Sequence, residues 1–260
     1  DGLANVRDVA SYKATSSSAA IAVSANGTAQ PGAYNVEIVS RAQEQRNYTK
    51  TFSSATDALG STSTLDLQVG SGTLKQIQIT ATDTLDSIAT KINGSGERVS
   101  ASVFYDGTNY RLQVRGLDTG SANGVTFGGT GATFLGLELP GSKYQSAQNA
   151  NVKIDNIAVT SATNQITGAI QGVTLALNDS SATAVTVKVE SDPQGLETKL
   201  KAVVDAYNSV ISKIHDSAGF GATKSSNAVL AGDSSLRSIT SRMSNAVLGS
   251  VAGAGTYTTL

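Results

Sequence analysis

The residues that could do chemistry in this sequence are few and widely spaced. His215 is the only histidine, and the chain has no cysteine. A site built from several histidines or thiolates and a cysteine nucleophile are therefore excluded. A serine hydrolase would need His215 as its base, but no Gly-x-Ser-x-Gly elbow lies on a strand-to-helix turn. We interpret His215 as a structural residue near the C-terminal end of a predicted helix, where a cation meets the helix dipole.

Two pairs of carboxylates could be the acid and the nucleophile of a glycosidase. They are Asp83 with Asp86, and Asp155 with Asp179. Each has a simpler interpretation, because Asp83 precedes a helix, the other pair lies in turns, and no acidic cluster stands beside aromatics that could stack a sugar. The sequence favours structural roles for all four.

The remaining motifs point away from cofactors and metals. Gly128-Gly129-Thr130-Gly131 is followed neither by Lys-Ser/Thr nor by a clear helical pattern, which predicts a flexible loop rather than a phosphate cradle. No Asp/Asn/Gly calcium loop is present. We therefore expect no catalytic, cofactor-binding or metal-binding residues, and a protein that binds or builds.

Composition narrows the class further. The chain has 260 residues, with 19 Lys and Arg against 20 Asp and Glu, a net charge of −1. This balance disfavours a nucleic-acid partner. Charged residues make up 15% of the chain, against about 25% in ordinary soluble domains, so Ser, Thr, Asn, Gln and Gly must build the surface. Such a surface suits an extracellular or assembly-bound β-rich protein.

Membrane insertion and a cleaved leader are not expected. No apolar run reaches the roughly 18–20 residues that cross a bilayer. The N-terminus shows no basic region followed by an apolar one. Either export uses another signal, or the chain is a fragment of a longer protein.

Hydrophobic periodicity predicts strands through most of the chain, with one clear helix among them. Residues 3–24 read as a short helix or an extended arm. The stretch 59–116 reads as β-β-α-β-β, with Asp83 or Thr84 as the helix N-cap and Gly94 as a left-handed C-cap. The expected strands, which alternate in polarity, are 34–38, 65–69, 77–79, 99–103, 110–114, 152–157, 173–177 and 185–189. We expect loop and a short strand at 124–136, and a helical turn at 166–170.

Two amphipathic helices are expected near the C-terminus. The first begins at Asp192-Pro193 and the second at Asp233. The first has apolar residues at near-heptad spacing: Leu196, Leu200, Val203, Val204, Tyr207, Val210, Ile211 and Ile214. The second carries Leu236, Ile239, Met243, Ala246 and Val247 on one face. Both stripes need partners, either in an ordinary three-helix cluster or, as we favour, in a bundle completed by missing terminal helices or another chain.

Because the strands lie between helical ends, we expect a multidomain α+β protein with nested domains. Residues 1–30 and 193–260 would form a helical leg or stalk. Residues 31–58 and 145–192 would form a β-rich head, and residues 59–144 an inserted β-rich head with one helix. Both heads would be mainly antiparallel.

Several stretches resemble the family of bacterial flagellar filament cap proteins, also called hook-associated protein 2. The similarity spans about Gly32 to Val247, and the shared order of the motifs is more specific than any one of them. The motifs are Gly32 to Ile38 with Arg41-Ala42-Gln43, Asp83 to Asn93, Val99 to Ala101, Tyr110 to Leu112, Ala147 to Ala150, Asn164 to Ile170, Gly172 to Leu175, Tyr207-Asn208 and Gly232 to Arg237. Asp155-Asn156 departs from the Asp-Gly turn common there, which alters one hairpin.

The resemblance implies a non-enzymatic protein without cofactors. It would be exported, and would form a homo-oligomeric ring at the distal tip of the filament, under which flagellin folds and joins. The family has long terminal coiled-coil segments, and we expect both to be missing here. An export chaperone would bind through the missing C-terminus. Flagellin contacts would involve exposed positions between Leu196 and Ile214 and between Leu236 and Leu248, with ring contacts from loops of the inserted domains.

Two rival functions are kept. One is an extracellular adhesin that binds host glycan or mucin, and the other is a filament-junction protein of the same axial family. We also predict that Tyr207→Ala costs about 3 kcal/mol or more if the ring is core. An unchanged melting midpoint would make Tyr207 an interface residue instead.

Overall fold

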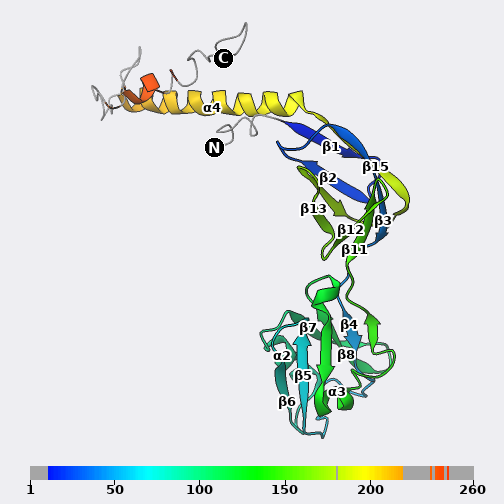
Figure 1. Ribbon diagram of the computed structural model, residues 1–260. Helices are drawn as coiled ribbons and strands as arrows, with labels where there is room; N and C mark the ends of the chain where they lie inside the picture. Colours follow the sequence, from blue (N-terminus) through cyan, green and yellow to red (C-terminus); the bar gives the residue numbers. More distant parts are fainter. Residues whose placement is uncertain (1–10, 180, 219–234, 236–237, 243–244, 246–260) are drawn as a thin grey trace. The chain divides into compact units, whose positions relative to one another are not determined.

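The computed structural model describes residues 11–179, 181–218, 235, 238–242 and 245 (Figure 1). For residues 181–182 and 215–218 it describes the backbone alone. The chain divides into two compact units: Tyr12–Ser191, and Asp1–Ser11 together with Asp192–Leu260. The first unit consists of antiparallel sheets with short helices, and the second contains the long helix α4 (Pro193–Ala218). The predicted α+β class with mainly antiparallel sheets is confirmed.

One half of the first unit is a β-sandwich, which we call the sandwich lobe. A five-stranded sheet, in the order β1-β15-β3-β11-β12, and a three-stranded sheet, β13-β14-β2, enclose one core. Strand β3 shows why: Val36 and Ile38 are buried while Asn35 is exposed, the alternation of a half-buried strand. The strands are β1 (Tyr12–Ser16), β2 (Ile21–Ala25), β3 (Gly32–Ser40), β11 (Ala150–Ile154), β12 (Ile157–Ser161), β13 (Gln165–Ile170), β14 (Val173–Leu177) and β15 (Ser181–Ser191).

The second core lies in what we call the mixed lobe. A four-stranded sheet, β10-β4-β8-β7, and a three-stranded sheet, β6-β5-β9, pack with two helices around Leu65, Ile88 and Leu112. The expected β-β-α-β-β order is confirmed, but its two hairpins belong to different sheets. The elements are β4 (Arg46–Tyr48), β5 (Ser63–Val69), β6 (Lys75–Ile79), α2 (Leu85–Asn93), β7 (Val99–Tyr105), β8 (Tyr110–Gly116), the 3₁₀ turn η1 (Ser121–Asn123), β9 (Val125–Gly128), α3 (Gly129–Leu135) and β10 (Lys143–Gln145).

The chain leaves the sandwich lobe after β3 and returns to it at β11. Strand β4 pairs with β8 and β10 of the mixed lobe, although the sequence analysis placed residues 46–48 in the head formed by 31–58. Three residues are too short to show a period, so only the pairing assigns β4.

Two segments for which a helix was considered are strands. Residues 3–24 were expected to be a short helix or an extended arm, and from Tyr12 on they form the strands β1 and β2, which pair with β15 and β14. This part of the segment is therefore extended and not helical. Residues 166–170 belong to β13, which pairs with β14. In both cases the local apolar pattern is weak, and pairing with a neighbouring strand outweighs it.

The glycine-rich run at 128–131 is not a loop, which corrects the prediction. It ends β9 and begins α3. A Cβ added at Gly131 would lie 2.7 Å from the backbone nitrogen of Leu65, so only glycine lets the helix pack on β5. Glycine is a poor helix former, and this hides the helix from the sequence, while burial of Ala132 and Leu135 stabilises it.

Helix α2 begins as predicted and ends differently. Thr84 is the N-cap, and its hydroxyl accepts a hydrogen bond from the Ser87 N–H at 3.1 Å. Gly94 is not left-handed: its φ is −81°, and its N–H still bonds the Thr90 carbonyl at 2.9 Å. The left-handed residue is Gly96, with φ of 80°.

Candidate functional site

The apolar stripe of α4 is the largest candidate interaction surface that the sequence predicted. The helix starts where expected, because the Asp192 carboxylate accepts a hydrogen bond from the Gly195 N–H at 3.0 Å. Val203, Val204 and Val210 are 37%, 49% and 38% exposed. None of the described side chains at 193–214 is buried. Exposed valines at helical spacing form a surface suited to contact with another helix.

Other predicted residues of the helical ends have mixed outcomes. Tyr207 is half-buried, so its ring is not the fully buried core group that was considered. The backbone of His215 lies in α4, but its side chain lies outside the described residues. Of the second apolar stripe, Ile239 is described and is 46% exposed. Four members lie outside the described residues: Leu236, Met243, Ala246 and Val247.

Asp83 is a structural carboxylate. It is buried, and it accepts hydrogen bonds from the Thr80 N–H at 2.7 Å, the Ser87 hydroxyl at 2.8 Å and the Lys91 ammonium. Burial alone would raise the pKa of Asp83, but these bonds outweigh it and hold the pKa well below the ordinary value. Asp86 is exposed on the same helix. A carboxylate kept ionised in this way cannot be the general acid of a glycosidase.

Asp155 is also occupied by the fold. Its carboxylate accepts from the Asn35 N–H at 2.9 Å, and its own N–H donates to the Asn35 carbonyl. Asp155 and Asn156 both have positive φ, 48° and 68°, and form the two-residue turn between β11 and β12. Asn156 thus takes the backbone conformation that glycine has in an Asp-Gly turn.

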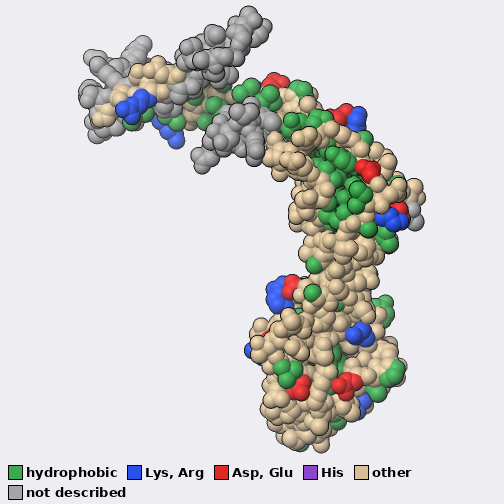
Figure 2. All heavy atoms as spheres, in the orientation of Figure 1, with side chains coloured by type: hydrophobic (Ala, Val, Ile, Leu, Met, Phe, Trp, Pro, Cys, Tyr) green, Lys and Arg blue, Asp and Glu red, His purple; other side chains and the backbone are tan. Residues whose placement is uncertain are grey.

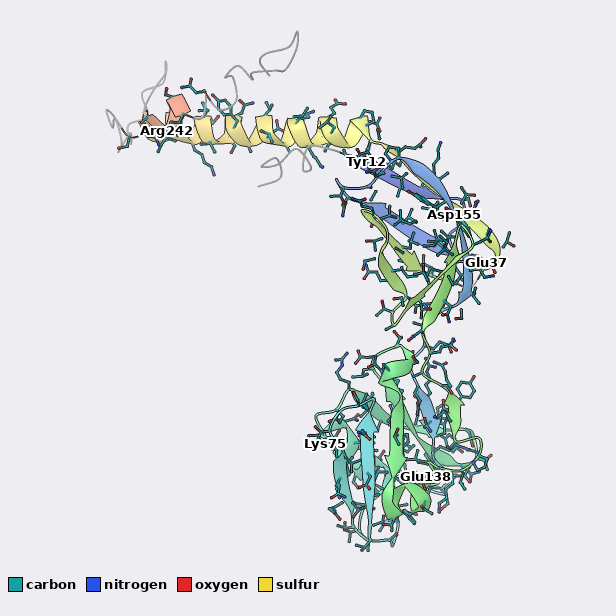
Figure 3. All side chains as sticks on the ribbon, viewed as in Figure 1. Tyr12, Glu37, Lys75, Glu138, Asp155 and Arg242 are labelled. Atoms are coloured by element: carbon teal, nitrogen blue, oxygen red, sulfur yellow. The ribbon has the colours of Figure 1, made fainter. Side chains whose placement is uncertain are left out.

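A polar depression of the sandwich lobe lies beside Asp155. Figure 3 labels Asp155 and Glu37 there, and the lining also includes Asn35, Lys153, Asn156 and Ala184. Lys153 is 3.3 Å from the Glu37 carboxylate. Asp179 is exposed and is not part of this lining.

Metal and membrane sites find no support in the described part of the chain. No group of three or more His, Cys, Asp or Glu side chains there could hold a metal ion. Nor is any of its helices both long and apolar enough to span a bilayer. The visible surface is mostly polar and uncharged, with hydrophobic side chains gathered over the sandwich lobe and scattered over the mixed lobe (Figure 2).

Three side-chain amides act as substitutes for a peptide group, which sequence reasoning missed. Each donates to the carbonyl and accepts from the N–H of one residue elsewhere in the chain: Asn93 with Ala101, Asn164 with Ala42, and Gln45 with Val125. An Asn or Gln can do this because its amide carries both a donor and an acceptor. Two of these three pairs lie within the motifs of the sequence analysis: Asn93 with Ala101, and Asn164 with Ala42. The asparagines in those motifs were therefore a signal for these hydrogen bonds.

Comparison with known proteins finds matches in the regions that contain these motifs. The family model described as "Flagellar hook-associated protein 2 C-terminus" matches residues 147–260, and "Flagellin hook IN motif" matches residues 64–118. Flagellar hook-associated protein 2 of Escherichia coli O157:H7 is 32% identical over 96% of this chain, and that of Aeromonas caviae is 27% identical over 89%. The chain spans 58% and 54% of these two relatives.

Solved structures show the same fold. The D1-D2-D3 domains of the flagellar cap protein FliD from E. coli match with a TM-score of 0.73 and 29% identity, over 96% of this chain and 72% of that one. The D2-D3 domains from the same species match with a TM-score of 0.63 and 30% identity, over 70% of this chain and all of that one.

The chain consists of antiparallel β lobes with a largely uncharged surface and of a helix with an exposed apolar stripe. Together with the family and structure matches, these features define a structural protein of the bacterial flagellum. Within that class, the chain belongs to the flagellar hook-associated protein 2 family, the filament cap proteins.

Proposed function

We propose that this protein is a structural cap at the distal tip of the flagellar filament. Exported subunits form a ring there that promotes folding and incorporation of flagellin and prevents its loss to the medium. The exposed apolar stripe on α4 carries the proposal, because such a surface on an exported protein needs another chain to cover it. Membership of the cap protein family supports the proposed location at the filament tip. The proposed function involves no catalysis.

We propose a division of labour close to the one that the sequence suggested, with a shorter N-terminal part of the leg. Residues 1–11 and 192–260 would form the leg that contacts flagellin, the β lobes would form the nested heads, and loops of the inserted lobe would make ring contacts. An export chaperone is a further proposed partner, to be tested by co-purification with the product of the full-length gene.

The test is deletion of the encoding gene in its native bacterium. Flagellin is then measured in the filtered medium and in attached filaments. Bare hooks with monomeric flagellin in the medium, both reversed by the full-length gene, are the expected result. Filaments of normal length and number in the deletion strain would reject the cap function.

A pair of substitutions in the complementing gene tests the role of α4. Val203→Glu places a charge in the apolar stripe, and we expect flagellin to appear in the medium. Ser209→Glu places the same charge on the opposite side of the helix by its 3.6-residue period, and filaments should form normally. If both substitutions released flagellin to the same extent, the apolar stripe would have no specific role in capping.

The adhesin function remains the rival proposal. It predicts that the β unit Tyr12–Ser191 alone binds host mucin, whereas the cap function needs α4 as well. Retention of this unit on a mucin-coated surface, together with normal filaments in the deletion strain, would favour the adhesin.

A further inference from the structure

The outward face of the four-stranded sheet in the mixed lobe concentrates aromatic and arginine side chains. Strands β4 and β8 lie side by side in Figure 1. Along β4, β8 and β7 the residues alternate between the core and solvent: Asn47, Leu112, Val114 and Ala101 are buried, and their neighbours face outward. The outward residues include Ser100, Ser102 and Gln113. We call the aromatic and arginine members of this outward set, together with Tyr144 of β10, the aromatic–arginine face: Arg46, Tyr48, Phe104, Arg111, Arg115 and Tyr144.

The aromatic part of this face does not serve the core. Tyr48 lies between Phe104 and Tyr144, with ring-centroid distances of 6.3 and 6.0 Å and edge-to-face geometry. Phe104 is 50% exposed and Tyr144 is 72% exposed. The chain has only 8 Tyr and 5 Phe and no Trp, so three rings on one solvent-facing surface are a concentration that folding does not require.

The arginine part costs stability. Arg46 and Arg115 stand directly opposite each other on β4 and β8, and like charges in that position destabilise a sheet. Arg46 is relieved by Glu44, with an Nη2–Oε1 distance of 2.6 Å. Arg111 has Asp106 at 3.8 Å. Arg115 makes no ion pair within 4.0 Å in the described part of the chain, but its charge, like that of Arg46, lowers the pKa of Glu44. The two arginines therefore share one carboxylate, and this part of the face keeps a net positive charge.

We propose that the aromatic–arginine face binds an acidic segment of a partner protein. A carboxylate from that segment contacts Arg115 and Arg46, where the planar guanidinium can donate two parallel hydrogen bonds. Apolar side chains of the segment pack on Phe104 and Tyr144. Tyr, Phe and Arg are the residues enriched in protein–protein contacts. This inference is independent of the proposed cap function.

The edge of the sheet favours a polypeptide over an anionic polysaccharide. Strand β10, which precedes the loop back to the sandwich lobe, is the terminal strand beside β4, and Tyr144 lies within it. An extended peptide can add to such an edge through backbone hydrogen bonds. A polysaccharide has no backbone amides in the repeat of a β-ladder, so it could use the arginines and rings but not this edge.

The test uses the whole chain and fluorescence anisotropy of a labelled synthetic peptide with alternating glutamate and leucine. We expect saturable binding that weakens as salt screens the charges, and no binding of the matched glutamine–leucine peptide. Arg115→Gln should weaken binding at least about tenfold. Lys75→Gln removes the same charge from β6, in the other sheet of the same lobe (Figure 3), and should leave binding unchanged.

A second readout separates binding from folding. Arg115→Gln removes a like charge opposite Arg46 and also a charge that favours the ionised form of Glu44, so its melting midpoint should change by no more than about 2 °C while binding falls. Tyr144→Ala should weaken binding without lowering the midpoint, since its ring is exposed. Equal weakening by Lys75→Gln, or no binding of the acidic peptide, overturns the proposal. Binding of heparin in the absence of peptide binding also overturns it, in favour of an anionic polysaccharide.

Discussion

Asp83 connects the end of β6 to two turns of α2 through one buried carboxylate. Its oxygens accept bonds from Thr80, Ser87 and Lys91. Because several donors converge on one group, removing its charge leaves more than one donor without a full partner. The carboxylate that looked like half of a catalytic pair therefore has a stabilising role.

Asp83→Asn should lower the free energy of unfolding by about 2–3 kcal/mol at neutral pH. The folded-state pKa of Asp83 lies below its unfolded value, so the stabilisation is complete above about pH 4 and is lost as the pH falls further. Thermal denaturation followed by circular dichroism at several pH values measures both effects. The difference in melting midpoint between the variant and the parent protein should become smaller below about pH 4.

Asp86→Asn is the matched control, because Asp86 is exposed on the same helix. It should change stability by no more than about 0.5 kcal/mol. If the two variants melted alike at neutral pH, the Asp83 network would have no stabilising role.

Gln45 is the most buried of the three peptide-substituting amides. It bonds the N–H and carbonyl of Val125 and also donates to the Asn47 side chain. Gln45→Glu keeps the shape but replaces the donor with a charged oxygen facing a carbonyl. We expect a loss of about 2–4 kcal/mol at neutral pH, measured by urea denaturation.

Gln78→Glu is the matched control, because it makes the same replacement of an amide by a carboxylate at an exposed position. Gln78 is exposed, and its Oε1 accepts a bond from the Thr64 hydroxyl, which a glutamate can also accept. Its unfolding midpoint should match that of the parent. A similar midpoint for Gln45→Glu would mean that the buried amide pairing contributes nothing.

The helix α3 depends on close approach to β5 more than on its own propensity. Gly131→Ala would place a Cβ 2.7 Å from Leu65 N and 2.8 Å from Leu65 Cα. Because both atoms are backbone, the helix must shift away from the sheet, at a cost of about 1–3 kcal/mol. Chemical denaturation measures the loss, and Thr133→Ala, at an exposed site of the same helix, should cost much less. An unchanged midpoint for Gly131→Ala would show that the helix is not held against β5.

The larger β unit closes on itself. Tyr12 of β1 pairs with Ser191 of β15, so both ends of the unit meet in one sheet. The buried residues of its two cores lie between Ile21 and Val189, and Tyr12, Ala14 and Ala20 pack against the sandwich core. Helix α4 belongs to the other unit. The unit therefore contains every strand needed to pair its own sheets.

A chain shortened to 12–191 should fold cooperatively and keep its β-type circular dichroism. We expect its melting midpoint to lie within a few degrees of the β transition in the whole chain, because no described residue outside 12–191 belongs to either core. The control is a chain shortened to 17–191, which lacks β1 and should be less stable. Loss of a cooperative transition in 12–191 would show that the helical ends support the β unit.

Regular patterns were sufficient where local and tertiary preferences agree. Three features are visible in the sequence: the alternation in β3, the N-cap of α2 and the start of α4. Each reflects a repeat or a cap within a few residues. The order of the motifs in the sequence also indicates the family. The segments β1, β2, β4, β13 and α3 were missed, because their short or weak patterns are outweighed by pairing with distant strands or by packing on β5.

The composition and the single histidine favour a binding or structural protein over an enzyme. The sequence could not show that Asp83 is surrounded by donors, that Asp155 bonds Asn35, or that Arg46 stands opposite Arg115. The donors to Asp83 are within eight residues of it, but only the packing of α2 against the end of β6 turns them toward one carboxylate. The other two relations join residues far apart in the chain, and strand register sets them. The side chains of Tyr48, Phe104 and Tyr144 come from three strands, and only their assembly in one sheet makes a common surface.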